Sequence, residues 1–180
     1  MLRTTFHYIQ RRAFHNTSRL LIAEGDRIPN VQLQLKSPGE TIMTQDLFKG
    51  KKSILFGVPG AFTPGCSKSH LPGYIQHAKE LKSKGIDLIA CVSVNDAFVM
   101  NAWGEQYNLQ DITLLADSKG ELAKAMDLSF DASGALGGYR FKRFAAILDD
   151  DKIVKVFIEP NNTGLSVSLA ENVLKNLSLQ

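Results

Sequence analysis

Three short apolar segments, separated by stretches with helical spacing, constrain the fold of this chain more than any other feature. Residues 53–58, 86–94 and 112–116 each read as a buried strand. Between the first two, the apolar residues of segment 63–83 recur at helical intervals, and Pro72 is expected to kink or interrupt its first turns. Buried strands joined by helical crossovers pair in parallel. The pattern therefore predicts the parallel core of an α/β sheet.

The flanking segments add further layers to this core. Asn95 or Asp96 can cap the helix that follows the second strand, which we expect to run to about Tyr107. The other expected elements are an edge strand at 31–35, a turn at 37–40, a short helix at 44–48, a helix at 121–128, a loop at 129–138, a hairpin of strands at 141–148 and 153–158, and a closing helix at 168–177. Together they predict a three-layer α/β sandwich with a central mixed β-sheet.

Length and composition exclude several classes of protein. A chain of 180 residues with 44% hydrophobic content can bury one full core. It contains no apolar stretch of about 18 residues, so we expect no membrane span. Two cysteines cannot form a disulfide-rich scaffold. No Cys/His cluster has the spacing of metal ligands, so no metal is expected.

The positive charge is concentrated at the N-terminus. Residues 1–21 contain four arginines and no acidic residue, and removing these four leaves 17 basic against 18 acidic residues. The remainder is nearly neutral and is not expected to bind nucleic acid. Residues 1–21 are typical of a mitochondrial transit peptide, which predicts a mature domain at 22–180 in the mitochondrial matrix. The alternative is a disordered basic arm; a secretory signal fits less well, because no unbroken apolar core follows the charges.

The segment between the first strand and the following helix carries the chemistry. Cys66 falls in the first turn of that helix, where free N–H groups and the helix dipole stabilise a thiolate. Thr63, three residues earlier, can place its hydroxyl beside the sulfur, and Pro59 and Pro64 stiffen the loop. Ionisation alone gives only a modest gain in rate, so other groups must stabilise the charge that develops during attack. Taken alone, Cys66 is equally compatible with a structural role.

The full pattern resembles the peroxiredoxins. Pro59, Thr63 and Cys66 match their Pro-x-x-x-Thr-x-x-Cys signature, and the surrounding sequence is similar to the peroxiredoxin 5 and plant type II branch. The branch motif continues in residues 70–74, and further matches lie at 93–96, 102–103, 142–144 and 163–165, so the resemblance covers roughly residues 25–178. It implies a thioredoxin-like fold and a cysteine-based peroxidase that reduces hydrogen peroxide and alkyl hydroperoxides without a bound cofactor.

The resemblance also implies roles for individual residues. Cys66 would be the peroxidatic cysteine, Thr63 would hydrogen-bond the peroxide and the thiolate, and Arg143 would stand beside the sulfur. From the sequence alone, Arg143 is better read as part of a surface ion pair. Arg140 is a weaker candidate for a supporting role. His70 lies four residues after Cys66, but the resemblance does not make it a catalytic base; we interpret it as structural or interface-lining.

The sequence leaves open how the oxidised Cys66 is reduced back to the thiol. Plant type II relatives have a resolving cysteine at the position of Cys91, whereas animal relatives place one in the loop where this chain has Val167. Cys91 is therefore either the resolving cysteine or a buried bystander in an apolar strand. The reductant would be thioredoxin, or glutathione with glutaredoxin.

Two other functions fit the sequence less well than a peroxidase. A thiol–disulfide oxidoreductase of the same fold would need Cys-x-x-Cys, which the residues after Cys66 do not provide. A redox sensor or a chaperone-like binding protein would not need Thr63 and Arg143. The resemblance suggests a homodimer packed through elements around the active site.

Overall fold

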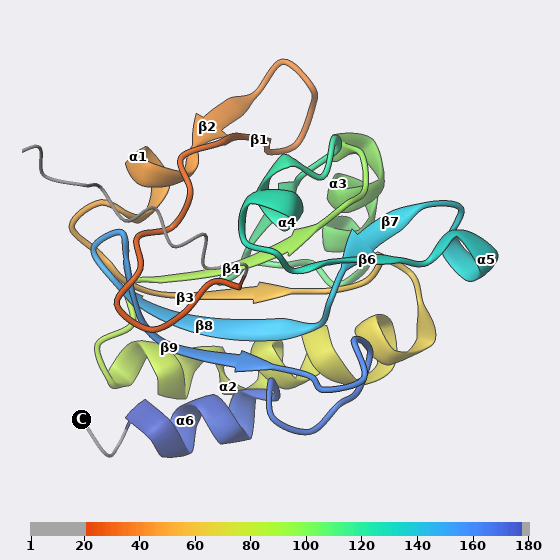
Figure 1. Ribbon diagram of the computed structural model, residues 1–180. Helices are drawn as coiled ribbons and strands as arrows, with labels where there is room; N and C mark the ends of the chain where they lie inside the picture. Colours follow the sequence, from red (N-terminus) through yellow and green to blue (C-terminus); the bar gives the residue numbers. More distant parts are fainter. Residues whose placement is uncertain (1–20, 178–180) are drawn as a thin grey trace, which may run out of the picture.

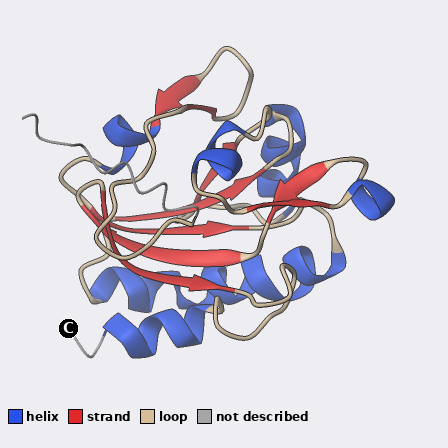
Figure 2. Ribbon diagram, viewed as in Figure 1, coloured by secondary structure: helices blue, strands red, loops and turns tan. Residues whose placement is uncertain are grey.

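The elements of the chain alternate as the sequence indicates. The computed structural model describes residues 21–177 (Figures 1 and 2), so the predicted leader lies, apart from Leu21, outside the described residues. In chain order the elements are β1 (Gln32–Gln34), β2 (Thr41–Met43), α1 (Thr44–Phe48), β3 (Lys52–Gly57), η1 (Cys66–His70), α2 (Leu71–Ser83), β4 (Leu88–Ser93), α3 (Ala97–Gln106), β5 (Thr113–Ala116), α4 (Glu121–Ala125), β6 (Ser129–Asp131), α5 (Ser133–Leu136), β7 (Tyr139–Phe141), β8 (Phe144–Asp149), β9 (Lys152–Ile158) and α6 (Ala170–Leu177). The Asp96 carboxylate caps α3 by accepting a hydrogen bond from the Val99 N–H.

The central sheet is mixed, as predicted. Its strands lie in the order β2-β1-β5-β4-β3-β8-β9. Strands β3, β4 and β5 are parallel, β8 pairs antiparallel with β3, and β9 pairs antiparallel with β8. The prediction of an edge strand at 31–35 is wrong, because β1 pairs with β5 on one side and β2 on the other. The chain turns at 37–40 and returns as β2, which takes the edge position.

Two apolar clusters fill the space on either side of the sheet. Residues of α2, α3 and α6 pack on one face, and residues of α1 and α4 pack on the other together with Phe141 of the β6–β7 ribbon. Figure 1 shows α2 and α6 together on one side and α1 and α4 on the opposite side. This arrangement confirms the three-layer sandwich. Within residues 21–177, no helix has the length and apolar character needed to cross a membrane.

The region before β9 departs from the sequence prediction. The expected loop at 129–138 contains β6 and α5, and the expected strand at 141–148 is divided into β7 and β8. The strand breaks at Lys142 and Arg143, whose N–H groups donate to the carbonyls of Leu128 and Asn162 instead of to a ladder partner. These long-range bonds place Arg143 immediately before β8.

Gly57 allows this part of the chain to approach the end of β3. Gly57 pairs with Phe144 across the antiparallel β3–β8 ladder. A Cβ at residue 57 would lie 2.1 Å from Cε1 of the Phe144 ring, a distance that no real side chain tolerates. The Phe144 ring therefore occupies the space that a side chain at residue 57 would need. The start of β8, with Arg143, is thus held beside the point where the chain leaves β3.

Candidate active site

Cys66 lies in the first turn of the helical segment that follows β3, as predicted. The segment opens with Pro64 and Gly65, and residues Cys66–His70 form a π-helical turn that continues into α2. Turns of this kind are rare, and many of those known lie at functional sites. In the loop before the segment, Phe62 is half exposed and has a left-handed backbone, with φ of 61°. Cys66 itself is fully buried.

A buried arginine stands beside the sulfur. Arg143 Nη1 donates a hydrogen bond to Cys66 Sγ at 3.4 Å, across 77 residues of sequence. Arg143 is 3% exposed, so the sequence-based reading of a surface ion pair is wrong. A guanidinium in a water-poor site stabilises negative charge that develops on a sulfur or on an oxygen next to it.

The other contacts of Arg143 fix its orientation. Nε donates to the Thr163 carbonyl at 3.2 Å, and Nη1 also lies 3.2 Å from Nδ1 of His70. Nε2 of His70 lies 3.1 Å from the Ser168 carbonyl, which can only accept. Nε2 therefore carries the proton, and Nδ1 accepts from Arg143. Burial and the charge of Arg143 lower the pKa of His70 to about 3, so the ring is neutral.

Thr63 and Pro59 lie in the loop that precedes Cys66, and Arg140 packs against this loop. The Thr63 hydroxyl donates to the Gly60 carbonyl at 2.9 Å, and Pro59 is buried at the start of the loop. Arg140 donates to the carbonyls of Val94 and Leu136 at 2.8 and 2.7 Å. Its Nη1 lies 3.7 Å from where a Cβ of Gly60 would be. These contacts hold Arg140 against the loop rather than against the sulfur.

Cys91 shares an apolar cluster with Cys66. It lies in β4 opposite Phe56 of β3, is fully buried and is a free thiol, as is Cys66. Burial and the negative charge of an ionised Cys66 raise the pKa of the Cys91 thiol well above its usual value, against an opposing effect of Arg143. The two cysteines therefore differ in their surroundings, since Cys66 has the guanidinium as a direct partner.

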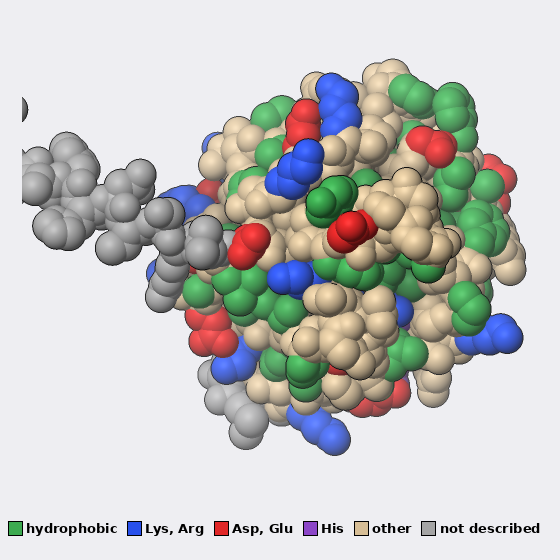
Figure 3. Space-filling view, turned by 45° about the vertical axis from the view of Figure 1, so that its right-hand side comes forward, with side chains coloured by type: hydrophobic (Ala, Val, Ile, Leu, Met, Phe, Trp, Pro, Cys, Tyr) green, Lys and Arg blue, Asp and Glu red, His purple; other side chains and the backbone are tan. Residues whose placement is uncertain are grey.

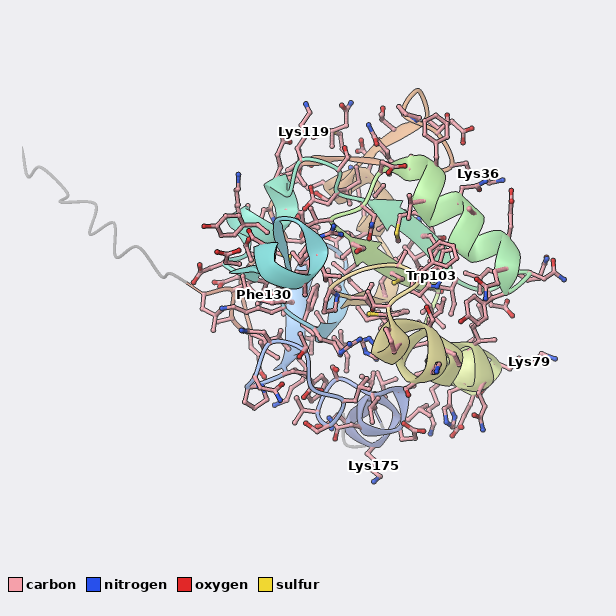
Figure 4. All side chains as sticks on the ribbon, turned by 90° about the vertical axis from the view of Figure 1, so that its right-hand side faces the viewer. Lys36, Lys79, Trp103, Lys119, Phe130 and Lys175 are labelled. Atoms are coloured by element: carbon pink, nitrogen blue, oxygen red, sulfur yellow. The ribbon has the colours of Figure 1, made fainter. Side chains whose placement is uncertain are left out.

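The sequence analysis did not identify Trp103 and Tyr107 as residues that hold the turn at Cys66. Trp103 is fully buried, and its Nε1 donates to Ser67 Oγ at 3.0 Å, while the Tyr107 hydroxyl donates to the Ser67 carbonyl. Figure 4 shows Trp103 between α3 and the helical segment that contains Cys66. Ser67, the residue after Cys66, is thus held from α3.

Glu159 was also missed. This carboxylate is 1% exposed and accepts hydrogen bonds from the N–H and hydroxyl groups of both Ser166 and Ser168. Burial alone would raise its pKa, but these four hydrogen bonds outweigh burial and lower the pKa to about 2. The available signal was a carboxylate directly after an apolar strand, with serines seven and nine residues later.

The described residues contain no group of three or more His, Cys, Asp or Glu side chains that could hold a metal ion. The chemistry of the site is that of a single sulfur, a fixed cation and a loop that carries a hydroxyl. Such a set can stabilise attack by sulfur on an electrophilic oxygen.

Comparison with known proteins shows similarity over almost the whole domain. The sequence profile of the Redoxin family matches residues 23–174. Peroxiredoxin-2E-2, chloroplastic, of Oryza sativa subsp. japonica is 46% identical over 164 residues, which cover 87% of this chain and 72% of the relative. Reduced Prx3 from Vibrio vulnificus in complex with hydrogen peroxide superposes with a TM-score of 0.81 at 46% identity, covering 87% of this chain and 99% of that one. Peroxiredoxin 5 from Alvinella pompejana gives a TM-score of 0.79 at 39% identity, with coverage of 88% and 99%.

Proposed function

The chain belongs to the redoxin family, as a peroxiredoxin of the peroxiredoxin 5 and plant type II branch, and on this premise we propose that Cys66 is the sulfur that attacks the peroxide. The fold is thioredoxin-like, and the protein is a thiol-dependent peroxidase. The observation that carries the proposal is the hydrogen bond from Arg143 Nη1 to Cys66 Sγ.

The reaction is a displacement at oxygen. The thiolate of Cys66 attacks one peroxide oxygen, so an S–O bond forms and the O–O bond breaks. The electron pair leaves on the other oxygen, which takes a proton and departs as water or an alcohol, and Cys66 becomes a sulfenic acid. Arg143 stabilises the charge on the leaving oxygen. The Thr63 hydroxyl, three residues from the sulfur, would turn from the Gly60 carbonyl to the peroxide.

Hydrogen peroxide and alkyl hydroperoxides are the proposed substrates. The similar Vibrio vulnificus protein has been solved with hydrogen peroxide bound, which supports the simplest of them. Because Cys66 is fully buried, residues around it must move for a peroxide to reach its sulfur.

The sulfenic acid must then be reduced. Resolution by Cys91 is supported by its position in the same apolar cluster as Cys66. The raised pKa and deep burial of Cys91 favour the alternative, in which glutathione or glutaredoxin attacks the oxidised Cys66 directly. A disulfide requires Cα atoms within roughly 7 Å, which implies local unwinding of the turn at Cys66. Loss of thioredoxin-dependent turnover in Cys91→Ser would support resolution by Cys91, and unchanged turnover would support the external thiol.

The cellular location and the oligomeric state of the protein are proposed from other observations. The acid-free, arginine-rich segment 1–21 supports import into the mitochondrial matrix. Exposed apolar side chains at Phe62, Phe98 and Leu165 support a homodimer that covers the surroundings of the active site. In the view of Figure 3, hydrophobic side chains are visible at several places on the surface.

The test of the proposed function is peroxide consumption by Cys66→Ser. We expect the purified wild type to consume hydrogen peroxide with a dithiol reductant and the variant to lose this activity, because the hydroxyl of serine is a far weaker nucleophile at neutral pH. Retained turnover in Cys66→Ser would remove Cys66 from this role.

A further inference from the structure

The loop between β9 and α6 is hydrogen-bonded to Arg143 at several atoms. Beyond the side-chain bond from Nε to the Thr163 carbonyl, the main chain of Arg143 is paired with the same loop. Its N–H donates to the Asn162 carbonyl at 2.6 Å, and its carbonyl accepts from the Glu159 N–H at 3.0 Å. Arg143 is thus held by this loop at both the backbone and the side chain.

A second path reaches Arg143 through His70. The ring is fully buried, and its Nδ1 accepts from the same Nη1 that donates to Cys66 Sγ. Its other nitrogen is held by the Ser168 carbonyl, which also accepts from the Tyr74 hydroxyl at 2.9 Å. Because Nη1 is hydrogen-bonded to both Sγ and Nδ1, a shift of the His70 ring changes the position of the donor relative to the sulfur.

The position of Ser168 in turn depends on Glu159. Oε1 of Glu159 accepts from the Ser168 N–H at 2.9 Å, from the Ser168 hydroxyl at 2.8 Å and from the Ser166 N–H at 2.8 Å. Oε2 accepts from the Ser166 hydroxyl at 2.6 Å. The carboxylate therefore fixes the end of the loop whose carbonyl holds His70. The peroxide does not need to touch Glu159 for this effect.

We propose that Glu159 is a positioning residue for the peroxidase reaction, which acts through Ser168 and His70 to hold the Arg143 guanidinium on the sulfur of Cys66. The inference rests on the proposed function of Cys66. Hydrogen bonds from a fixed donor are worth most when the donor is already in place as charge develops. Loss of the carboxylate leaves Arg143 charged and present but no longer aimed at the sulfur.

The experiment compares second-order rate constants for oxidation by hydrogen peroxide in the full chain. In Glu159→Ala we expect a decrease of about 10- to 100-fold, somewhat less than removal of a donor itself. Glu159→Gln should stay within about threefold of the wild type, because its amide oxygen can accept the three bonds to Oε1 and its N–H₂ can donate to the Ser166 hydroxyl. Asp151→Ala is the matched control: that carboxylate lies at the opposite end of β9 and pairs with Arg27, so its loss should leave the rate unchanged.

The Arg143→Ala background separates positioning from general destabilisation. If Glu159 acts through Arg143, then adding Glu159→Ala to Arg143→Ala should change the rate constant by less than about twofold. A full additional decrease in the double variant would overturn the proposal, as would a wild-type rate in Glu159→Ala. Should Glu159→Ala fail to fold, His70→Phe replaces it, because phenylalanine keeps a ring of similar volume without the nitrogens. The proposal requires the same decrease of the rate constant in His70→Phe. It also requires that His70→Phe cause no further decrease when it is added to Arg143→Ala. Lack of peroxide oxidation in the wild type would instead overturn the proposed function.

Discussion

At the scale of single residues, the charge states of the buried groups around Arg143 are set by their neighbours. Arg143 contacts a sulfur, a ring nitrogen and a carbonyl oxygen. Burial, together with the charge of Arg143, lowers the pKa of His70 and keeps its ring neutral. Glu159 is ionised because four hydrogen bonds replace its water. The hydrogen bonds link each of these groups to its neighbour, so one protonation pattern of the groups is stable at neutral pH.

This pattern predicts a loss of stability in mild acid. The pKa of His70 is lowered to about 3, whereas an unfolded histidine titrates near 6.5. Below about pH 6.5 the unfolded chain binds a proton that the folded chain excludes, so the free energy of unfolding falls as the pH falls toward 3. Glu159, with its pKa lowered to about 2, adds a loss in the same direction below about pH 4.5.

Urea unfolding at pH 7 and pH 5 measures the contribution of His70. The wild type should lose about 2 kcal/mol between the two values through this residue. His70→Phe has no ring nitrogen to protonate, so its loss should be smaller by about that amount. An equal loss in both proteins would show that His70 takes up its proton in the folded chain.

At the scale of elements, the local patterns predicted most strands and helices but not the break that places Arg143. Residues 141–148 read as one apolar strand, and the bonds that divide it run from Lys142 to Leu128 and from Arg143 to Asn162. Bonds between segments so far apart leave no trace in the spacing of apolar residues. Cys66 and Thr63 could be found because their motif is local. Glu159 has local serine partners, but its link to the sulfur runs through His70 and Arg143, which only the fold brings together.

The π-helical turn is the element that must move if Cys91 resolves the sulfenic acid. Trp103 is the single tryptophan of the chain, and its Nε1 bond to Ser67 joins α3 to this turn. Unwinding would break that bond. We therefore predict that one equivalent of peroxide changes the Trp103 emission of the wild type in two steps, sulfenic acid formation and disulfide formation. Cys91→Ser should show the first step alone, and a second step in that variant would contradict resolution by Cys91.

At the scale of the whole molecule, the basic leader and the nearly neutral domain are expected to act independently. The proposed site residues all come after position 58, and the family match begins at residue 23. Deletion of residues 1–21 should therefore leave peroxide consumption by the purified protein unchanged within about twofold, since no site residue is removed. The same deletion should abolish mitochondrial import of a fluorescent fusion. A truncated fusion that still enters mitochondria would contradict the assignment of the leader.

The assignment of Cys66 as the reacting sulfur can be tested directly by locating the first oxidation event. The reduced full chain is treated with one equivalent of hydrogen peroxide, and its intact mass and proteolytic peptides are measured. We predict that Cys66 is always modified, either with one added oxygen as the sulfenic acid or with the loss of two hydrogens as a disulfide to Cys91. Oxidation of Cys91 while the Cys66 thiol stays free would contradict the account.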